Sequence, residues 1–406
     1  MPVFDKTAMP EIIVHPGEQS SPALRDAPAP LRYSLQPMRI QTLRERLRAL
    51  GALPQHEQRV LRLWSQARPQ TAGRRQIEHF LPAALRAGLP AIEAELAGLA
   101  RIESAHPGDD GSERLLVRLA DGQLVESVLL LPDRAQGVCV STQVGCAVGC
   151  AFCMTGTTGL IRQVGSAEIV AQVALARTRR EVKKVVFMGM GEPAHNLDNV
   201  LEAIELLGTV GNIGHKNLVF STVGDTRVFE ALPRGPVRPA LALSLHTTRA
   251  ELRERLLPRA PLLTPDELVE AGEAYARATG YPIQYQWTLL AGINDGDDEI
   301  EGIVRLLAGK YAILNLIPYN SVEGMPFERP SWEQAADMAR RLHRRGILTK
   351  LRQSAGQDVD GGCGQLRARA ETPARKVVPV RAAAASAVAG QIDRPFLRNQ
   401  REGLAR

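Results

Sequence analysis

Three cysteines stand close together in a glycine-rich stretch of the chain. Residues 145 to 153 read GCAVGCAFC, so Cys146, Cys150 and Cys153 have C-x3-C-x2-C spacing. Structural zinc takes four tetrahedral ligands, usually as two pairs, and the nearby fourth thiol, Cys139, falls within a predicted strand. Inert core cysteines would lie on a periodic apolar face, which this segment lacks. A [4Fe-4S] cluster normally binds four thiolates. Three thiolates would leave one iron open to bind another molecule.

The other properties of the chain suit a reduced compartment. Its 406 residues include five cysteines, four of them between residues 139 and 153 and the fifth at 363. A secreted disulfide framework would spread an even number along the chain, so this pattern indicates a metal or a reactive thiol. The net charge of +6 permits a nucleic-acid partner without requiring one. The sequence shows neither a membrane-spanning run nor a signal-peptide pattern, so we expect a cytoplasmic protein with no membrane partner.

Short apolar runs alternate with longer amphipathic ones between residues 137 and 353. This alternation predicts βα units and a parallel sheet, closed or partly closed as a barrel, and hence an α/β fold. In such sheets ligand-binding groups gather at the carboxyl ends of the strands. The predicted strands are 137–142, 183–190, 217–224, 239–246, 283–290, 312–319 and 347–353, and the predicted helices are 166–180, 197–210, 265–279, 297–307 and 331–345. Thr264 and Glu267 form a predicted capping box at the start of one of these helices.

We expect five regions along the chain. They are a flexible lead (1–38), a helical N-terminal domain (39–105), a β-hairpin connector (106–136), the barrel with a cysteine loop (137–366) and a basic tail (367–406). Apolar residues repeat at intervals of three and four in the second region, and Asp121-Gly122 is a hairpin turn signal in the third. The tail is expected to be disordered and solvated, with an RNA-contacting arm as the alternative.

The motifs resemble those of a known enzyme family. The cysteine spacing, with Phe152 before the last cysteine, is similar to that of the radical S-adenosylmethionine (SAM) superfamily, and MGMGEP after the second strand resembles its SAM-binding segment. Taken together, five blocks between residues 122 and 366 resemble the RlmN/Cfr family of radical SAM RNA methyltransferases, which modify adenine at C2 or C8. The blocks, in chain order, are GVCVSTQVGCAVGCAFCMTGTTG, VVFMGMGEPAHNLDNV, LALSLHTT, NLIPYN and GQDVDGGCGQL.

The resemblance implies a partial barrel of the radical SAM type, a [4Fe-4S] cluster and SAM as cofactors. Cys146, Cys150 and Cys153 would hold the cluster. The implied SAM site is lined by Gly191, Glu192, Ser221, Ser244, Leu245, His246 and Asn320. Cys363 matches the family's methyl-carrying cysteine, Cys139 its resolving cysteine and Glu126 a glutamate assigned as proton acceptor.

The implied chemistry explains why thiols are needed. Adenine C2 and C8 are electron-poor carbons that cannot attack the electrophilic methyl group of SAM. In the mechanism that the family implies, the Cys363 thiolate takes a methyl group from one SAM by displacement. A second SAM yields a 5′-deoxyadenosyl radical, which abstracts hydrogen from that methyl group so that it adds to adenine. Attack by Cys139 on the Cys363 sulfur then releases the product and leaves a transient disulfide.

Taken singly, several of these residues have simpler interpretations. Cys363 would be an incidental loop cysteine, although its glycine neighbours favour a mobile loop; Cys139 would be a buried strand cysteine. Glu126 would be a solvated hairpin charge, and His246 a core histidine.

The expected function is methylation of adenine C2 in structured RNA, with 23S rRNA as the expected target and tRNA as a second possibility. The alternatives are C8 methylation, another RNA, a non-catalytic Fe-S RNA-binding protein, or a zinc-stabilised nucleic-acid module. The expected partners are the RNA and an electron donor such as flavodoxin or ferredoxin. The resemblance also implies a monomer.

Overall fold

A computed structural model of the chain describes residues 37–73, 77–132, 136–321, 324–352 and 364–371. Cys363, nearly all of the expected lead and the tail beyond residue 371 lie outside these ranges.

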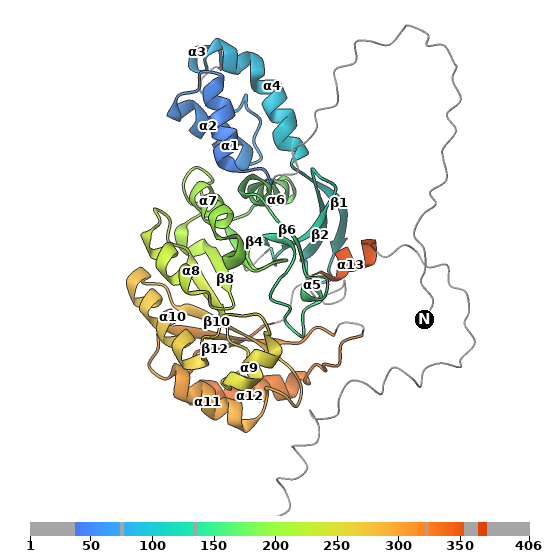
Figure 1. Ribbon diagram of the computed structural model, residues 1–406, viewed down its shortest axis with the longest axis vertical. Coiled ribbons are helices and arrows are strands. Elements are labelled where there is room, and N and C mark those ends of the chain that lie inside the picture. Colours follow the sequence, from blue (N-terminus) through green and yellow to red (C-terminus); the bar gives the residue numbers. More distant parts are fainter. Residues whose placement is uncertain (1–36, 74–76, 133–135, 322–323, 353–363, 372–406) are drawn as a thin grey trace, which may run out of the picture. The chain divides into compact units, whose positions relative to one another are not determined.

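The described part of the chain is built around a ten-stranded sheet with the order β1-β2-β3-β4-β7-β8-β9-β10-β11-β12 (Figure 1). The strands from β4 onward are parallel, which confirms the α/β fold with a parallel sheet, and β1 to β4 pair antiparallel. Their bounds are β1 (Ala100–Pro107), β2 (Glu113–Leu119), β3 (Leu124–Leu129), β4 (Gly137–Cys139), β7 (Lys184–Phe187), β8 (Leu218–Thr222), β9 (Ala240–Ser244), β10 (Ile283–Leu289), β11 (Ala312–Pro318) and β12 (Thr349–Leu351). In the described residues β1 and β12 are unjoined edges, so the sheet is open.

Helices follow most of the parallel strands, and α7, α8, α10 and α11 form a layer along one side of them (Figure 1). The bounds are α6 (Ser166–Arg179), α7 (Leu197–Gly208), α8 (Thr226–Ala231), α9 (Ala250–Leu256), α10 (Pro265–Thr279), α11 (Asp297–Leu307) and α12 (Trp332–Arg344), with 3-10 turns η1 (Pro193–Asn196), η2 (His215–Asn217) and η3 (Leu232–Arg234). The predicted capping box is present: the Thr264 hydroxyl accepts the Glu267 N–H at 3.2 Å and the Glu267 carboxylate accepts the Thr264 N–H at 2.8 Å.

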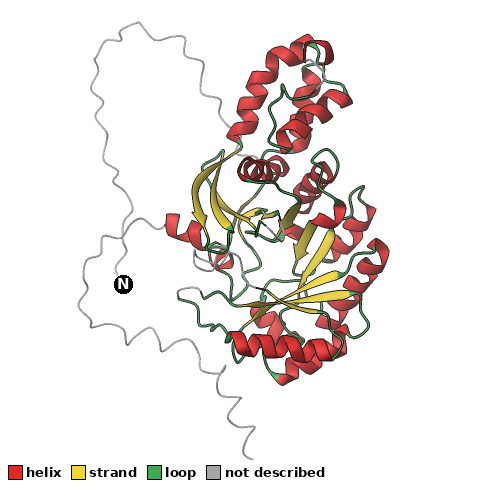
Figure 2. Ribbon diagram, turned by 180° about the vertical axis from the view of Figure 1, so that it is seen from behind, coloured by secondary structure: helices red, strands yellow, loops and turns green. Residues whose placement is uncertain are grey.

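The N-terminal helices share a core with the sheet. They are α1 (Ile40–Ala49), α2 (Pro54–Ser65), α3 (Ile77–Phe80) and α4 (Ala83–Gly98), at one end of the ribbon in Figure 2. Leu43 and Leu85 belong to the same cluster of buried side chains as Val170 on α6. The Arg177 guanidinium on α6 also donates to the Ser65 carbonyl at 2.7 Å. The expected boundary after residue 105 falls inside β1, because this strand already begins at Ala100.

The hairpin of β2 and β3 extends the main sheet. β3 pairs with β4 at Val128 opposite Cys139. The turn contains Gly122 at φ 88°, a left-handed conformation that glycine adopts without strain. The sequence-based expectation treated this hairpin as a connector. Because β3 pairs with β4, the hairpin is part of the main sheet and lies beside the first parallel strand.

Gln172 on α6 ties the hairpin to that first strand. Its fully buried amide oxygen accepts the Ser127 hydroxyl at 3.0 Å and the Ser141 N–H at 2.9 Å, and its amide nitrogen donates to the Ser141 carbonyl at 2.9 Å. Buried backbone groups need such partners, because an unsatisfied one costs the full desolvation free energy.

None of the described helices is both long and apolar enough to span a bilayer.

Replacing Gln172 by Leu should lower the free energy of unfolding by about 3 kcal/mol, because the N–H and C=O of Ser141 lose their buried partner. The measurement is the urea midpoint of the purified protein. Gln58→Leu is the matched control, since it makes the same change at an exposed position of α2. Equal midpoints for the two variants would contradict the assigned role of Gln172.

Candidate active site

The three clustered cysteines lie on a loop between a small ribbon and a short helix. Cys146 follows β5 (Gln143–Gly145), which pairs with β6 (Leu160–Gln163), and Cys153 precedes α5 (Met154–Thr157). Gly145 has φ +79°, and a Cβ there would lie 1.9 Å from the Gly159 carbonyl oxygen, so only glycine fits where the ribbon meets the loop.

The far side of the loop is held by the segment around α9. The Ala151 N–H donates to the Leu256 carbonyl at 2.9 Å, and the Arg259 guanidinium donates to the Ala147 carbonyl at 2.7 Å. These two hydrogen bonds attach the loop to the segment around α9.

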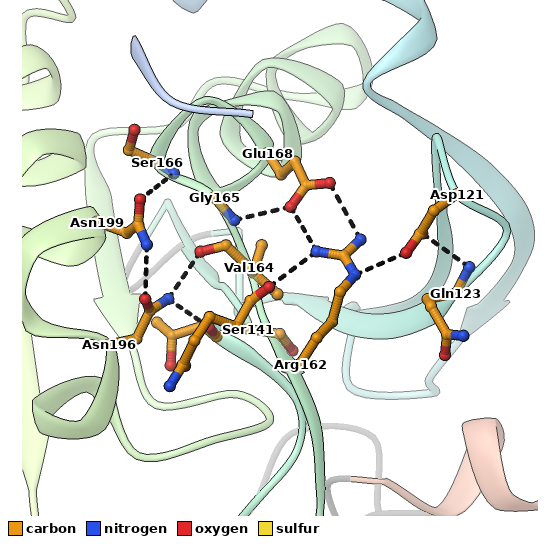
Figure 3. Close-up of polar contacts among 12 residues, drawn as sticks. Asp121, Gln123, Ser141, Arg162, Val164, Gly165, Ser166, Glu168, Asn196 and Asn199 are labelled. Carbon is orange, nitrogen blue, oxygen red and sulfur yellow. Dashed lines mark hydrogen bonds and ion pairs between the residues drawn. The ribbon is translucent and has the colours of Figure 1, made fainter. Parts of the chain in front are cut away.

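An ion-pair network fixes the ribbon that carries the loop (Figure 3). The Arg162 guanidinium, on β6, lies between the carboxylates of Asp121 at the hairpin turn, 2.7 Å away, and Glu168 on α6, 2.8 Å away. Glu168 also accepts the Gly165 N–H at 2.7 Å. Asn196 donates to the Val164 and Thr142 carbonyls, each at 2.7 Å (Figure 3). The hairpin, α6 and η1 therefore all position the cysteine loop.

The three thiols lie in a desolvated setting. Burial raises the pKa of Cys146 to about 11, and burial is also the main cause that raises the pKa values of Cys150 and Cys153. The neighbouring thiols raise the pKa of Cys150 further, because like charges disfavour each other. Within the described ranges, no three His, Cys, Asp or Glu side chains are close enough to hold one metal ion. A buried set of mutually repelling thiolates fits a larger cationic iron-sulfur core, which would offset their charge.

Glu192 joins the carboxyl ends of β7 and β8. Its buried carboxylate accepts the N–H groups of Ala194 and Val223, each at 3.0 Å, and its own N–H donates to the Gln143 side chain at 2.8 Å. Burial raises the pKa of Glu192 to about 7. Gly191 has φ +100°, and a Cβ there would lie 2.5 Å from Cβ of Gln143. The close approach explains why glycine precedes this glutamate.

His246 lies two residues beyond the end of β9, in a left-handed conformation with φ 61°. Its Nδ1 accepts the Thr288 N–H at 3.0 Å, and its ring meets the Phe152 ring edge-on at a centroid distance of 4.9 Å. Burial is the main cause that lowers its pKa to about 3, so the imidazole is neutral at physiological pH. Phe152 thereby connects the cysteine loop to the end of β9, where Ser244 and the fully buried Leu245 lie.

Arg253 on α9 is a buried cation that the sequence analysis missed. Its guanidinium donates to the Val223 carbonyl at 2.5 Å and to the Ser244 carbonyl at 3.2 Å, so it joins the ends of β8 and β9. Burial lowers its pKa to about 10, whereas the Cys150 thiol acts in the opposite direction. No sequence signal could distinguish it among the arginines of ELRERLLPRA, since only the packing shows which one is buried.

The remaining candidate site residues lie in two regions, the carboxyl ends of β8 and β11 and the pairing of β3 with β4. Ser221 lies near the end of β8 and Asn320 shortly after β11, and parallel strands bring these ends to one edge of the sheet. Cys139 ends β4, beside β3 and β7. Glu126 on β3 is buried, pairs with Arg114 at 3.3 Å and interacts electrostatically with Cys153.

Cys363 lies outside the described residues. The next residue in the chain, Gly364, packs against Thr155, so that a Cβ on Gly364 would lie 2.7 Å from the Thr155 hydroxyl.

A three-thiol loop at the carboxyl edge of an open parallel βα sheet defines a radical SAM enzyme. The family model of the radical SAM superfamily matches residues 140–307. A probable RNA methyltransferase of Leptothrix cholodnii is 72% identical over 85% of this chain and 98% of its own length. One of Pseudomonas aeruginosa is 66% identical over 85% of this chain and all of its own length. The crystal structure of a radical SAM methyltransferase from Sphaerobacter thermophilus, 36% identical, has a TM-score of 0.68 and covers 82% of this chain and 98% of its own.

The chain therefore belongs to the radical SAM superfamily and, within it, to the family of these methyltransferases. It is a SAM-dependent radical SAM methyltransferase, and this membership implies a [4Fe-4S] cluster and SAM as cofactors.

The first prediction from this site concerns iron retention. Arg253→Met should speed the release of iron to a chelator under anaerobic conditions by about fivefold, because it removes a buried cation beside the Cys150 thiolate. Arg253→Lys keeps the charge, so its rate of iron release should lie between those of Arg253→Met and the wild type. Arg255→Met, at an exposed position of α9, is the matched control. Identical release rates for Arg253→Met and Arg255→Met would disprove the electrostatic role.

The second prediction concerns pH in the iron-free protein. The pKa of Glu192 is raised from 4.5 to about 7, so its protonation stabilises the fold below pH 4.5 and this contribution is lost as pH rises through about 7. From pH 4.5 to pH 8 the wild type should lose about 3 kcal/mol of stability relative to Glu192→Gln, whose amide does not titrate. Urea unfolding of both proteins across this range measures the difference. If the difference in free energy of unfolding between the two proteins did not change with pH, the pKa of Glu192 would not be raised in the folded protein.

Proposed function

We propose that this enzyme is an RNA methyltransferase of the RlmN/Cfr type that methylates an adenine ring carbon, C2, in structured RNA, with 23S rRNA as the first candidate and tRNA as the second. The observation that carries the proposal is the packing of Gly364, the residue after Cys363, on Thr155, two residues after Cys153. This contact brings the chain that follows the fifth cysteine to the three-thiol loop. The names of the relatives in Leptothrix and Pseudomonas, probable RNA methyltransferases, support RNA as the substrate.

The proposed cofactor ligands lie along the carboxyl edge of the sheet. Cys146, Cys150 and Cys153 would hold the cluster, and Gly191, Glu192, Ser221, Ser244, Leu245, His246 and Asn320 would line the SAM site. When bound, the cluster supplies one electron to SAM, and SAM supplies both a methyl group and a hydrogen-abstracting radical. The imidazole of His246 is neutral at physiological pH, so it would add no positive charge to the SAM site.

Cys363 and Cys139 would divide the transfer between them. The Cys363 thiolate would attack the methyl carbon of SAM, so that an S–CH3 bond forms as the sulfonium bond breaks. This methyl group would lose one hydrogen atom to the radical derived from a second SAM, and its carbon would then add to the adenine ring. The ring would regain its aromaticity by losing its proton and one electron, which replaces the electron that SAM cleavage consumes. The Cys139 thiolate attacks the Cys363 sulfur to form a disulfide, and the carbon leaves with the bonding electron pair and takes a proton to become the new methyl group. Two electrons from a cellular thiol reductant restore the thiols.

Glu126 would accept the proton that adenine loses. Burial is the largest cause that raises its pKa, and a raised pKa suits a group that must take up a proton. A flavodoxin or ferredoxin would donate the electron, and the enzyme would act in the cytoplasm as a monomer.

Cys363→Ala tests the proposal directly. The purified variant should keep its iron and still form 5′-deoxyadenosine from SAM, while methyl transfer to RNA falls at least a hundredfold, because no other thiol takes the methyl group. Cys146→Ala is the comparison variant and should lose both iron and SAM cleavage. Methyl transfer retained by Cys363→Ala would end the proposal.

The RNA target follows from mass spectrometry of RNA from cells with and without the gene. A 2-methyladenosine that disappears with the gene and maps to one nucleotide is the expected result. Loss of 8-methyladenosine would show that the enzyme methylates C8 and not C2, and unchanged RNA methylation would refute RNA as the substrate.

A further inference from the structure

The carboxylate of Glu126 has more protein partners than a proton acceptor needs. It lies at the start of α13 (Gln365–Glu371) and accepts the N–H of Arg367 at 2.9 Å. The N–H groups of Gly364 and Leu366 donate to the same carboxylate and lower its pKa against the effect of burial. Backbone N–H groups at the first turn of a helix have no intrahelical partner, so one side chain satisfies three of them here.

A buried cation holds the carboxylate from the other side. Arg114, on β2, lies 3.3 Å from Glu126, on β3, and the side chains are 3% and 2% exposed. The two strands pair antiparallel, with Leu116 opposite Glu126 and Arg114 opposite Val128, so the ion pair runs diagonally across the hairpin. Glu126 therefore joins the hairpin to α13 through a charge whose own position is fixed by the sheet.

Apolar and steric contacts complete the docking of α13. Leu366 forms a small buried cluster with Leu116 and Leu124 of the hairpin. The Arg367 guanidinium reaches the Thr158 hydroxyl at 3.4 Å, just beyond α5. Gly364 lies against Thr155 with φ +93°, where a larger residue would be strained and would clash. The segment thus touches both the hairpin and the helix that follows Cys153.

We propose that Glu126 is a positioning residue that fastens the first turn of α13 to the hairpin and so sets where the chain from Cys363 enters the site. The inference rests on the proposed role of Cys363 and adds a second role to Glu126. The docked segment, residues 364–371, is short, and its buried apolar contact consists of one leucine with two partners. Three hydrogen bonds to a charged group are therefore a large share of what holds it.

The experiment is hydrogen–deuterium exchange of the full-length protein, read on the peptide that contains residues 364–371. In Glu126→Ala and the isosteric Glu126→Gln, the amides of this peptide should exchange at least tenfold faster than in the wild type. Leu366→Ala should also raise the exchange rate. Glu113→Gln is the matched control, because Glu113 is an ion-paired carboxylate on the same hairpin that bonds Arg179 instead of α13. Wild-type exchange in Glu126→Gln and Glu126→Ala would overturn the inference.

A second measurement separates positioning from general destabilisation and from proton transfer. In Leu366→Ala, which keeps Glu126, SAM cleavage should stay within about twofold of the wild type while RNA methylation falls at least tenfold, because the cofactor site is intact and the start of α13 is displaced. In Glu126→Gln, RNA methylation should also fall at least tenfold. An equal loss of both activities would indicate a merely structural role. Lost methylation with wild-type exchange would leave Glu126 a proton acceptor only. Cys363→Ala should not alter exchange of α13, so failure of the proposed function and failure of this inference are distinguishable.

Discussion

The site depends on burying three thiols that repel one another when ionised. Burial raises the pKa values of all three thiols, and the carboxylate of Glu192 raises those of Cys146 and Cys150 further. The buried cation of Arg253 interacts electrostatically with Cys150. A protein can maintain such a set only if the backbone around it is rigid. The ribbon, the hairpin turn and α9 supply that rigidity through backbone hydrogen bonds and the Arg162 ion pairs.

The edge of the sheet serves two purposes at once. His246, beyond the end of β9, contacts Phe152 in the cysteine loop. The ends of β7, β8 and β9 are bound together by Glu192 and Arg253. Each of these charged side chains uses its hydrogen bonds on backbone groups of neighbouring strands. Glu192 and Arg253 therefore help to hold these strand ends together beside the cysteine loop.

Much of the framework could be predicted from local sequence patterns. The parallel strands and the helices 166–180, 197–210, 265–279, 297–307 and 331–345 appear within three residues of their expected bounds, because apolar periodicity and capping residues are local signals. The β5–β6 ribbon was missed because its strands are three and four residues long and pair across the cysteine loop. The hairpin was expected as a connector, and its place in the main sheet was not predicted, because nothing local to it shows that β3 pairs with β4.

The sequence by itself determined the class of chemistry, since C-x3-C-x2-C and MGMGEP specify thiolate ligands and a glycine turn whatever the surroundings. The tertiary structure alone decided which charges are buried. It selected Arg253 among its neighbours. It also shows that Glu126, which taken singly would be a solvated hairpin charge, is a buried carboxylate that binds the start of α13. The physical reason is that burial and hydrogen bonding between distant segments arise from packing, and Glu126 and Arg367 are 241 residues apart in the chain.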